Sequence, residues 1–202
     1  AAYGRGMICA PISEECAARL GLSLMVERNT ESMGTAFTVT ADHKDSTTGI
    51  SAFERARTVR ELANPESESG DFMKPGHIFP LIARPGGVLK RAGHTEAAVD
   101  LARMAGLQQA GVICEVMNDD GTMARVPQLI EFAARHELKI ITVADLITYR
   151  RKNEKLVRLA GRAKLPTRFG EFEIAAYENT VSGEQYIALI KGDIGSSREP
   201  GL

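Results

Sequence analysis

The chain has 202 residues, of which 44% are hydrophobic and 25% are charged, and its formal net charge is -1. This balance excludes a disordered chain, and it argues against a nucleic-acid-binding surface and against electrostatic attachment to a membrane. No apolar run approaches the roughly 18 residues that cross a bilayer, and the sequence does not start with a signal-peptide pattern. We therefore predict a cytoplasmic protein without nucleic-acid or membrane partners.

The cysteines predict neither a disulfide framework nor a thiolate zinc site. Cys9, Cys16 and Cys114 are odd in number and show no Cys-x-x-Cys spacing. This pattern is typical of buried, reduced thiols.

Short apolar runs alternate with helical segments in the first part of the chain. Residues 7–11 are typical of a buried strand, and Ser13 followed by two glutamates predicts a helix that stops near Gly21. Residues 36–40 alternate apolar and polar side chains, which predicts a strand. His43 follows in a turn, where we expect a solvated side chain.

A capping pattern predicts the next helix. Ser51 and Glu54 stand three residues apart, so each side chain can accept a hydrogen bond from the other residue's backbone N–H. The helix is expected to end near residue 64. The polar, acidic residues 66–71 that follow predict a flexible surface loop or lid just before His77.

Residues 71–125 contain the side chains that are best suited to catalysis or ligand binding. His77 and His94 each stand on a glycine-containing turn, and Glu115 lies in an apolar, strand-like run at residues 111–117. Because the neighbours of Glu115 at two-residue spacing are apolar, we expect its side chain to be enclosed by an apolar face, where desolvation would suit proton transfer. Taken alone, the three side chains also fit plain structural roles, as a packed histidine, a turn or capping histidine and a surface carboxylate.

Two local features shape this segment further. Residues 74–76 predict a turn that delivers His77 into an apolar run, and Thr95 predicts the cap of a helix that ends near Gly106. A helix N-terminus preceded by Arg91 suits a phosphate group, because its first N–H groups lack intrahelical acceptors and the helix dipole favours an anion.

The remaining residues complete a layered pattern. Helices are predicted at residues 127–136 and 145–157, with a strand at residues 139–143 between them. Helices between short strands predict an α/β (α+β layered) fold, with a mixed sheet covered by helices. Beyond this part, strands are predicted at residues 172–177 and 185–191, which indicates a partial β-rich C-terminal extension.

Three sequence blocks resemble 3,4-dihydroxy-2-butanone 4-phosphate synthase, an enzyme of the riboflavin pathway. They are Lys74-Pro75-Gly76-His77, the run from Gly86 to Ala97 that reads GGVLKRAGHTEA, and the run from Cys114 to Ala124 that reads CEVMNDDGTMA. The blocks occur in the family's order and at its spacing, and the resemblance covers roughly residues 3–151. Residues 158–202 look like the start of GTP cyclohydrolase II, so we predict domains at 1–157 and 158–202 of a bifunctional enzyme.

The resemblance implies a lyase that converts D-ribulose 5-phosphate to L-3,4-dihydroxy-2-butanone 4-phosphate and formate with Mg²⁺ or Mn²⁺, and it implies a homodimer. His77 and Glu115 would be catalytic, and His94 would be a metal ligand. The substrate would contact a set of six residues, namely Arg91, Ala92, Gly93, His94, Thr95 and Glu115. Ala92 replaces a glycine that many relatives have.

One feature of the family has no counterpart in this sequence. Members carry an acidic loop upstream of the region that matches Tyr3, and this loop supplies a glutamate to the metals. We therefore expect full activity only with such an upstream segment, and no cyclohydrolase activity from the 158–202 region alone. The alternative is a non-catalytic phosphosugar-binding or dimerisation module.

Overall fold

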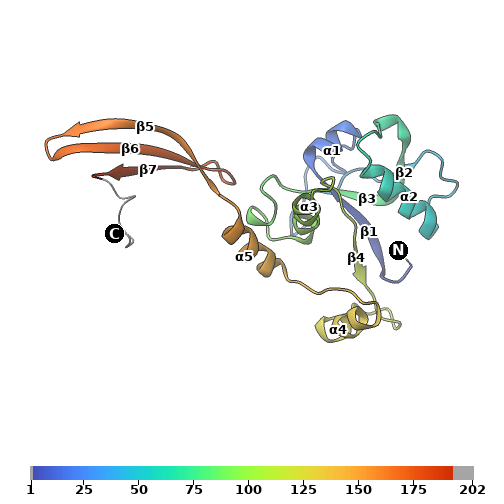
Figure 1. The fold of residues 1–202 in the computed structure, drawn as a ribbon. Helices are drawn as coiled ribbons and strands as arrows, with labels where there is room; N and C mark the ends of the chain where they lie inside the picture. Colours follow the sequence, from blue (N-terminus) through green and yellow to red (C-terminus); the bar gives the residue numbers. More distant parts are fainter. Residues whose placement is uncertain (1, 193–202) are drawn as a thin grey trace. The chain divides into compact units, whose positions relative to one another are not determined.

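The structure of the protein is a computed structural model that describes residues 2–192 (Figure 1). The chain divides into two compact units, Ala1–Ile147 and Thr148–Leu202, and each is described by itself. In the described chain, no helix is both long enough and apolar enough to cross a membrane.

The first unit is built on a four-stranded mixed sheet. Its strands are β1 (Arg5–Ile12), β2 (Ala41–His43), β3 (Phe72–Ile82) and β4 (Ile113–Val116), in the order β2-β3-β1-β4. β1 runs parallel to β3, whereas β2 is antiparallel to β3 and β4 is antiparallel to β1. The predicted mixed sheet is confirmed.

Two helices cover one face of this sheet. The side chains of Ile8, Ala10 and Ile12 on β1 form a core with residues of α1 (Glu14–Arg19) and α2 (Ala52–Leu62). Ser13 caps α1 by accepting a hydrogen bond from the backbone N–H of Cys16, and Ser51 caps α2 through the N–H of Glu54. Both predicted helix starts are confirmed.

A second, smaller core forms beside the first. The helix α3 (His94–Met104) contacts β1, β4 and a short 3-10 turn, η2 (Gly87–Leu89). Its residue Ala97 packs with Val88 and with Leu146 of α5 (Val143–Asn153). Between α3 and α5 the chain adds β4 and the helix α4 (Val126–Arg135), in which Pro127 occupies the first turn as predicted.

Three predicted elements differ from the structure. Residues 36–40 form only isolated bridges, Phe37 with Leu81 and Thr38 with Leu24, and the strand begins later, at β2. Residues 74–76 lie inside β3 rather than in a turn. Residues 139–142 form no strand, because none of the described segments pairs with them. β propensity alone cannot supply a partner strand.

The solvated side chain predicted for His43 is also wrong. His43 is buried, donates its backbone N–H to Thr58 Oγ1 at 3.0 Å, and packs edge-to-face on Phe72. Residues 66–71 lie mostly at the surface, as predicted, and specific contacts hold them. They include the 3-10 helix η1 (Ser69–Asp71), and Asp71 Oδ1 accepts from Lys44 Nζ at 2.7 Å.

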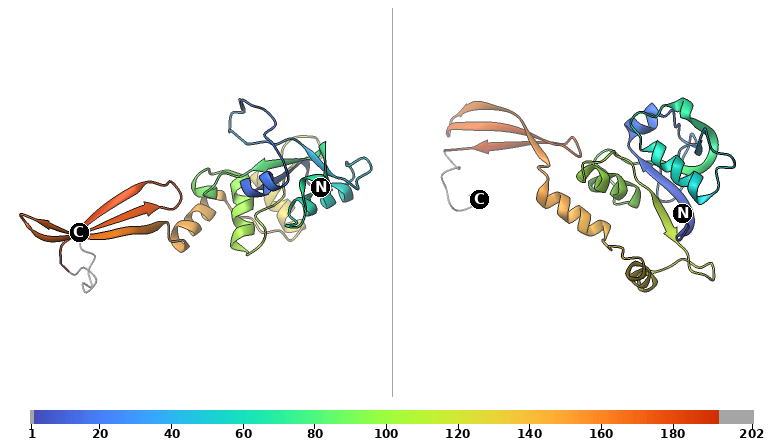
Figure 2. Two further views of the ribbon diagram at one scale, coloured as in Figure 1. Left: turned by 90° about the horizontal axis from the view of Figure 1, so that it is seen from above. Right: turned by 45° about the vertical axis from the view of Figure 1, so that its right-hand side comes forward.

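The second unit contains a three-stranded antiparallel sheet. Its strands are β5 (Val157–Thr167), β6 (Gly170–Asn179) and β7 (Gln185–Ile190), which lie side by side in both views of Figure 2. The strands predicted at residues 172–177 and 185–191 are confirmed, apart from end residues. Ala175 is fully buried in β6, while Tyr186, Ile187 and Leu189 of β7 are exposed.

Candidate active site

The face of the first sheet opposite α1 and α2 holds the residues predicted to act on protons. Successive side chains of a strand point to opposite faces, and Ile8 and Ile78 point into the core below α1 and α2. His77, which precedes Ile78 on β3, therefore points to the opposite face. Glu115 points to that opposite face as well, because its neighbour Cys114 packs against the core below α1 and α2.

Strand register places His77 and Glu115 on one row of this face. Cys9 of β1 pairs with Phe79, so Met7 and His77 hold equivalent positions two residues earlier on these parallel strands. On the other side of β1, the backbone N–H of Met7 donates to Glu115 Oε2 at 3.1 Å. Two strand spacings separate His77 from Glu115, which corresponds to about 10 Å between their backbones.

His77 is held by a carboxylate that the sequence did not single out. Asp42 Oδ1 accepts the backbone N–H of His77 at 2.9 Å, and Asp42 Oδ2 lies 2.6 Å from the ring Nδ1. The Asp42 side chain is 7% exposed, whereas the His77 side chain is 44% exposed. The signal for Asp42 in the sequence was slight, since it is one polar residue at the end of a β-branched run.

A tightly bonded loop closes over this pair. At Gly49, which has φ +75°, an added Cβ would stand 2.0 Å from Asp42 Oδ2 and 2.8 Å from His77 Nδ1. Glu54 at the start of α2 accepts hydrogen bonds from the N–H and the hydroxyl of Thr47 and from the Ser51 hydroxyl. These bonds, the Thr47 hydroxyl first, lower the pKa of Glu54 to about 2. Glu54 therefore fixes the loop that covers Asp42 and His77.

The loop contacts predict an acid-dependent contribution to stability. A carboxyl group whose pKa falls from 4.5 to about 2 on folding stabilises the native state above pH 4.5, and this contribution is lost as the pH falls toward 2. We expect Glu54→Gln to lower the thermal midpoint at pH 7 and to have little effect near pH 2. Thermal unfolding of both proteins across this range measures the difference.

Ser13→Ala is the matched control for this series. It removes the cap of α1, which does not titrate, so its cost of about 1 kcal/mol should not depend on pH. An effect of Glu54→Gln that is equally constant from pH 7 to pH 2 would contradict the role assigned to Glu54.

The start of α3 is organised by a second buried carboxylate. Glu96, which is 1% exposed, accepts the backbone N–H of Arg84 at 3.0 Å and pairs with Arg91 Nη1 at 2.6 Å. The rest of the Arg91 guanidinium donates to Met33 O and Thr35 Oγ1. Arg91 thus ties the loop before β2 to the first turn of α3, and its substrate contact stays a prediction.

Gly93, one of the predicted substrate contacts, stands at a position where a side chain would not fit. Gly93 is the N-cap of α3, and a Cβ there would stand 2.3 Å from Arg91 Nη1 and 2.6 Å from Glu96 Oε2. The Arg91–Glu96 pair crosses over Gly93, so a side chain at position 93 would displace it. The expectation that Thr95 caps the helix is wrong, because Thr95 lies inside the first turn and is buried.

The Arg91–Glu96 pair yields a stability prediction. Arg91→Met should cost about 3–5 kcal/mol, because the Glu96 carboxylate then stays buried without its cationic partner. Chemical denaturation measures this cost. Arg57→Met is the control, since the Arg57–Asp45 pair is about half exposed and should contribute at most about 1 kcal/mol. Equal costs for the two variants would contradict a buried structural pair.

His94 and Ala92 lie at the surface beside this turn. Both are exposed, and His94 is the first residue of α3. Within residues 2–192, no group of three or more His, Cys, Asp and Glu side chains is placed to hold a metal ion. Mg²⁺ prefers six ligands that are mostly oxygen atoms. His94 thus fits a single coordination position, and the described residues do not fit a complete magnesium site.

The apolar enclosure predicted for Glu115 is wrong. Its side chain is exposed, and it accepts a hydrogen bond from the backbone of β1. Cys9, one strand over, is buried, and burial followed by the charge of Glu115 raises the pKa of this thiol to about 11. The buried, reduced state predicted for Cys9 is confirmed, whereas Cys16 and Cys114 are free but only partly buried.

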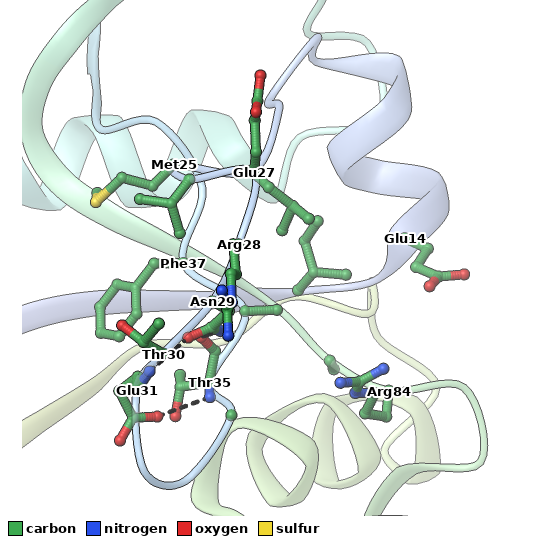
Figure 3. Close-up of a pocket in the computed structure, with 16 residues that line it drawn as sticks. Glu14, Met25, Glu27, Arg28, Asn29, Thr30, Glu31, Thr35, Phe37 and Arg84 are labelled. Atoms are coloured by element: carbon green, nitrogen blue, oxygen red, sulfur yellow. Dashed lines mark hydrogen bonds between the residues drawn. The ribbon is translucent and has the colours of Figure 1, made fainter.

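One cavity lies apart from these residues. It has a volume of about 410 Å³ and is formed by the loop before β2, the end of β3 and Glu14. Figure 3 shows Arg84 and Glu14 at one side and Glu31 and Thr35 at the other. Glu31 accepts the N–H groups of Met33 and Thr35, which lower its pKa to about 2. None of His77, His94 and Glu115 lines this cavity, so its size does not identify it as the reaction site.

Comparison with known protein families gives two matches. A family model for 3,4-dihydroxy-2-butanone 4-phosphate synthase matches residues 1–149, and one for GTP cyclohydrolase II matches residues 157–200. The riboflavin biosynthesis protein RibBA of Bacillus mycoides (strain KBAB4) is 58% identical over 200 residues, which are 99% of this chain and 50% of that protein. The chain therefore spans about half the length of the curated relatives it matches.

Solved structures agree with the fold. The crystal structure of RibBX, a two-domain 3,4-dihydroxy-2-butanone 4-phosphate synthase from A. baumannii, has a TM-score of 0.81 and 45% identity over 94% of this chain and 56% of that chain. A synthase in complex with two magnesium ions has a TM-score of 0.72 and 41% identity over 75% of this chain and 76% of that chain.

The protein is thus an α+β protein with a mixed sheet, and its relatives are proteins of riboflavin biosynthesis. The chain belongs to the 3,4-dihydroxy-2-butanone 4-phosphate synthase family, and a GTP cyclohydrolase II fragment follows the synthase domain.

Proposed function

We propose that the synthase domain of this chain is a lyase that converts D-ribulose 5-phosphate to L-3,4-dihydroxy-2-butanone 4-phosphate and formate. The observation that carries the proposal is the row on the sheet face opposite α1 and α2, where an exposed histidine held by a buried aspartate stands two strands from an exposed glutamate. The family match over residues 1–149 supports this reaction.

The two side chains of this row suit the proton transfers of the reaction. Forming an enediol from a ketose phosphate requires a base at a carbon that bears a hydroxyl group and an acid at the adjacent carbonyl oxygen. The backbones of His77 and Glu115 stand about 10 Å apart, on either side of Met7 of β1, and both side chains are exposed to a sugar phosphate bound over this row. We assign the proton transfers to these two residues.

The phosphate of the substrate fits the first turn of α3. Arg91 is already paired with Glu96, so the backbone N–H groups at the helix start are the donors that remain suited to an anion. His94 and Thr95 supply these groups, with Ala92 and Gly93 beside them, since the Gly93 N–H already donates to Arg91 O at 2.8 Å. This assignment retains the predicted substrate segment and gives Arg91 the task of holding it in place.

The proposal includes a divalent cation, Mg²⁺ or Mn²⁺. A relative of 41% identity was crystallised with two magnesium ions, and His94 offers one ligand. The described residues do not form a complete site, so the remaining ligands must come from an acidic segment such as the family carries upstream, from the substrate or from water. The proposal also includes a homodimer, supported by exposed apolar side chains at Leu24, Val26 and Met33.

A chimera tests the activity directly. This chain would replace the matching half of the Bacillus mycoides relative, which supplies the surrounding polypeptide. We expect the chimera to release formate from ribulose 5-phosphate when Mg²⁺ is present, and we expect Glu115→Gln to lower turnover by about 100-fold or more. A folded chimera that releases no formate would refute the proposed reaction.

The second candidate function is a phosphosugar-binding or dimerisation module. It is favoured by the absence of a complete metal-ligand group among residues 2–192. Calorimetry separates the two candidates, because a module would bind ribulose 5-phosphate without turnover in the chimera.

The assignment of His94 as a ligand predicts a change in metal dependence. His94→Ala in the chimera should abolish turnover at ordinary Mg²⁺ concentrations and leave the thermal midpoint nearly unchanged, because this exposed ring buries little apolar area. Formate release measured across a Mg²⁺ titration checks the first effect.

His136→Ala provides the control for His94. His136 stacks on Phe132 and Tyr3, with ring centroids 4.4 and 5.1 Å away, so its loss should lower the midpoint and leave the Mg²⁺ curve unaltered. A His94 variant that behaves in the same way would remove His94 from the metal site.

A further inference from the structure

Asp100 is a buried aspartate of α3 whose carboxylate holds the turn before the predicted substrate segment. The residue is 3% exposed, and its Oδ2 accepts the backbone N–H of Val88 in η2 at 2.8 Å. Gly87 lies directly against the same carboxylate, because a Cβ there would stand 2.2 Å from Oδ1 and 2.3 Å from Oδ2. Gly87 also has φ +62°, which residues with a side chain rarely adopt. The turn therefore fits Asp100 at two adjacent residues.

The carbonyl group of Gly87 connects this turn to the start of α3. Gly87 O accepts the backbone N–H groups of Lys90 at 2.9 Å and of Arg91 at 3.1 Å. Arg91 O in turn accepts the N–H of Gly93, the N-cap of α3, at 2.8 Å. A continuous series of contacts thus leads from the carboxylate of Asp100 to the first residues of the helix.

Asp100 and Glu96 hold different parts of one loop. They stand four residues apart on α3, so they face the same side of the helix, and both are almost fully buried. Glu96 accepts the N–H of Arg84 and pairs with Arg91, which are the two ends of residues 84–91. Asp100 contacts the middle of this loop. No position of the loop between its two ends is held by Glu96, so this contact of Asp100 fixes the η2 turn.

The ion pair of Asp100 is a weaker contact than its hydrogen bond to the turn. Arg103 Nη2 lies 3.8 Å from Asp100 Oδ1, and the Arg103 side chain is 40% exposed, so solvent screens this pair. The bond to the Val88 N–H is shorter and buried, and a buried N–H that loses its acceptor is costly. We therefore expect the turn to depend on the acceptor oxygen rather than on the negative charge.

We propose that Asp100 is a positioning residue of the substrate-binding segment, which holds η2 so that residues 91–95 keep the geometry that receives the phosphate group. The part of this inference that concerns the substrate rests on the proposed function. The hydrogen bond to Val88 can be measured without any turnover, so the two can fail separately.

Hydrogen exchange of the 202-residue chain measures the contact itself. We expect slow exchange of the Val88 N–H in the wild-type chain, and exchange faster by about 10-fold or more in Asp100→Ala, where the acceptor is missing. The N–H of Thr38, which donates to Pro80 O at 3.0 Å in another part of the unit, should keep its rate. Asp100→Asn retains an acceptor oxygen and should keep the Val88 N–H protected.

The chimera supplies the kinetic readout. Asp100→Ala should raise KM for ribulose 5-phosphate by about 10-fold or more and change kcat by only a few-fold, because the segment binds the phosphate and not the reacting carbons. Gly87→Ala should also raise KM, since its Cβ would push the turn away from an intact carboxylate. Asp100→Asn should leave KM within a few-fold of the wild-type value.

Two control variants separate this contact from general effects of charge and of turn stability. Arg103→Met removes the ion pair of Asp100 and should leave KM unchanged. Asp120→Ala removes an exposed aspartate that accepts the backbone N–H of Thr122 at 2.9 Å in a different turn. It should change neither the exchange of the Val88 N–H nor KM.

Rapid exchange of the Val88 N–H in the wild-type chain overturns the positioning role, as does a KM in Asp100→Asn that rises as much as in Asp100→Ala. A loss of turnover in Asp100→Ala with unchanged KM also overturns it, because a merely structural residue gives that result. If the chimera is inactive but Val88 responds as expected, the proposed function fails while the contact stands. If Asp100→Ala does not fold, Gly87→Ala and Asp100→Asn decide, since only the first should raise KM.

Discussion

The parallel pairing of β1 with β3 is the constraint on which the first unit depends. It aligns Cys9 with Phe79 and Ile12 with Ile82, and strand alternation then assigns every neighbouring side chain to one of two faces. One face supplies the core under α1 and α2. The other receives His77 and, through the pairing of β1 with β4, Glu115. A slip of one residue would bury these polar side chains and expose Ile8 and Ile78.

Three carboxylates fix the positions of residues around this sheet. Asp42 holds His77, Glu54 holds the loop that covers Asp42, and Glu96 holds Arg91 across Gly93. Each satisfies backbone N–H groups as well as a side chain, so each removes freedom from a segment that has little apolar surface of its own. Loops that carry function need this support because they bury few apolar contacts.

The sequence predicted the helices and the mixed sheet well because their signals are local. Ser13 and Ser51 indicate where α1 and α2 begin, and the spacing of apolar residues predicts β1 and α4. The sequence-based predictions failed where pairing with another strand decides whether a segment forms a strand. Residues 139–142 have strand composition but no described strand to pair with, and residues 74–76 look like a turn although neighbouring strands hold them in β3.

The site was predictable to a similar extent. His77, His94 and Glu115 were identified from motifs, but Asp42 and Glu96 were not, since their importance arises from residues 35 and 5 positions away and from burial. The exposure of Glu115 beside Met7 was not predicted either, because a strand residue whose neighbours in sequence are apolar can still be solvent-exposed. Composition describes the strand, whereas packing decides which face is enclosed.

Arg91 pairs with Glu96 in the structure, and the sequence also predicted it to contact the substrate. The charge of the pair explains how the two roles relate. Its guanidinium is neutralised by a carboxylate that is almost fully buried, and its other donors hold Met33 and Thr35. A cation in that state adds little net positive charge to the turn, so the phosphate site proposed above would depend on the N–H groups of α3 and on the helix dipole. These donors are backbone groups, and their direction is set by Gly93 as N-cap and by Glu96, the third residue of the helix. In that proposal the Arg91–Glu96 pair would act by holding the helix start in place, without a contact between Arg91 and the anion.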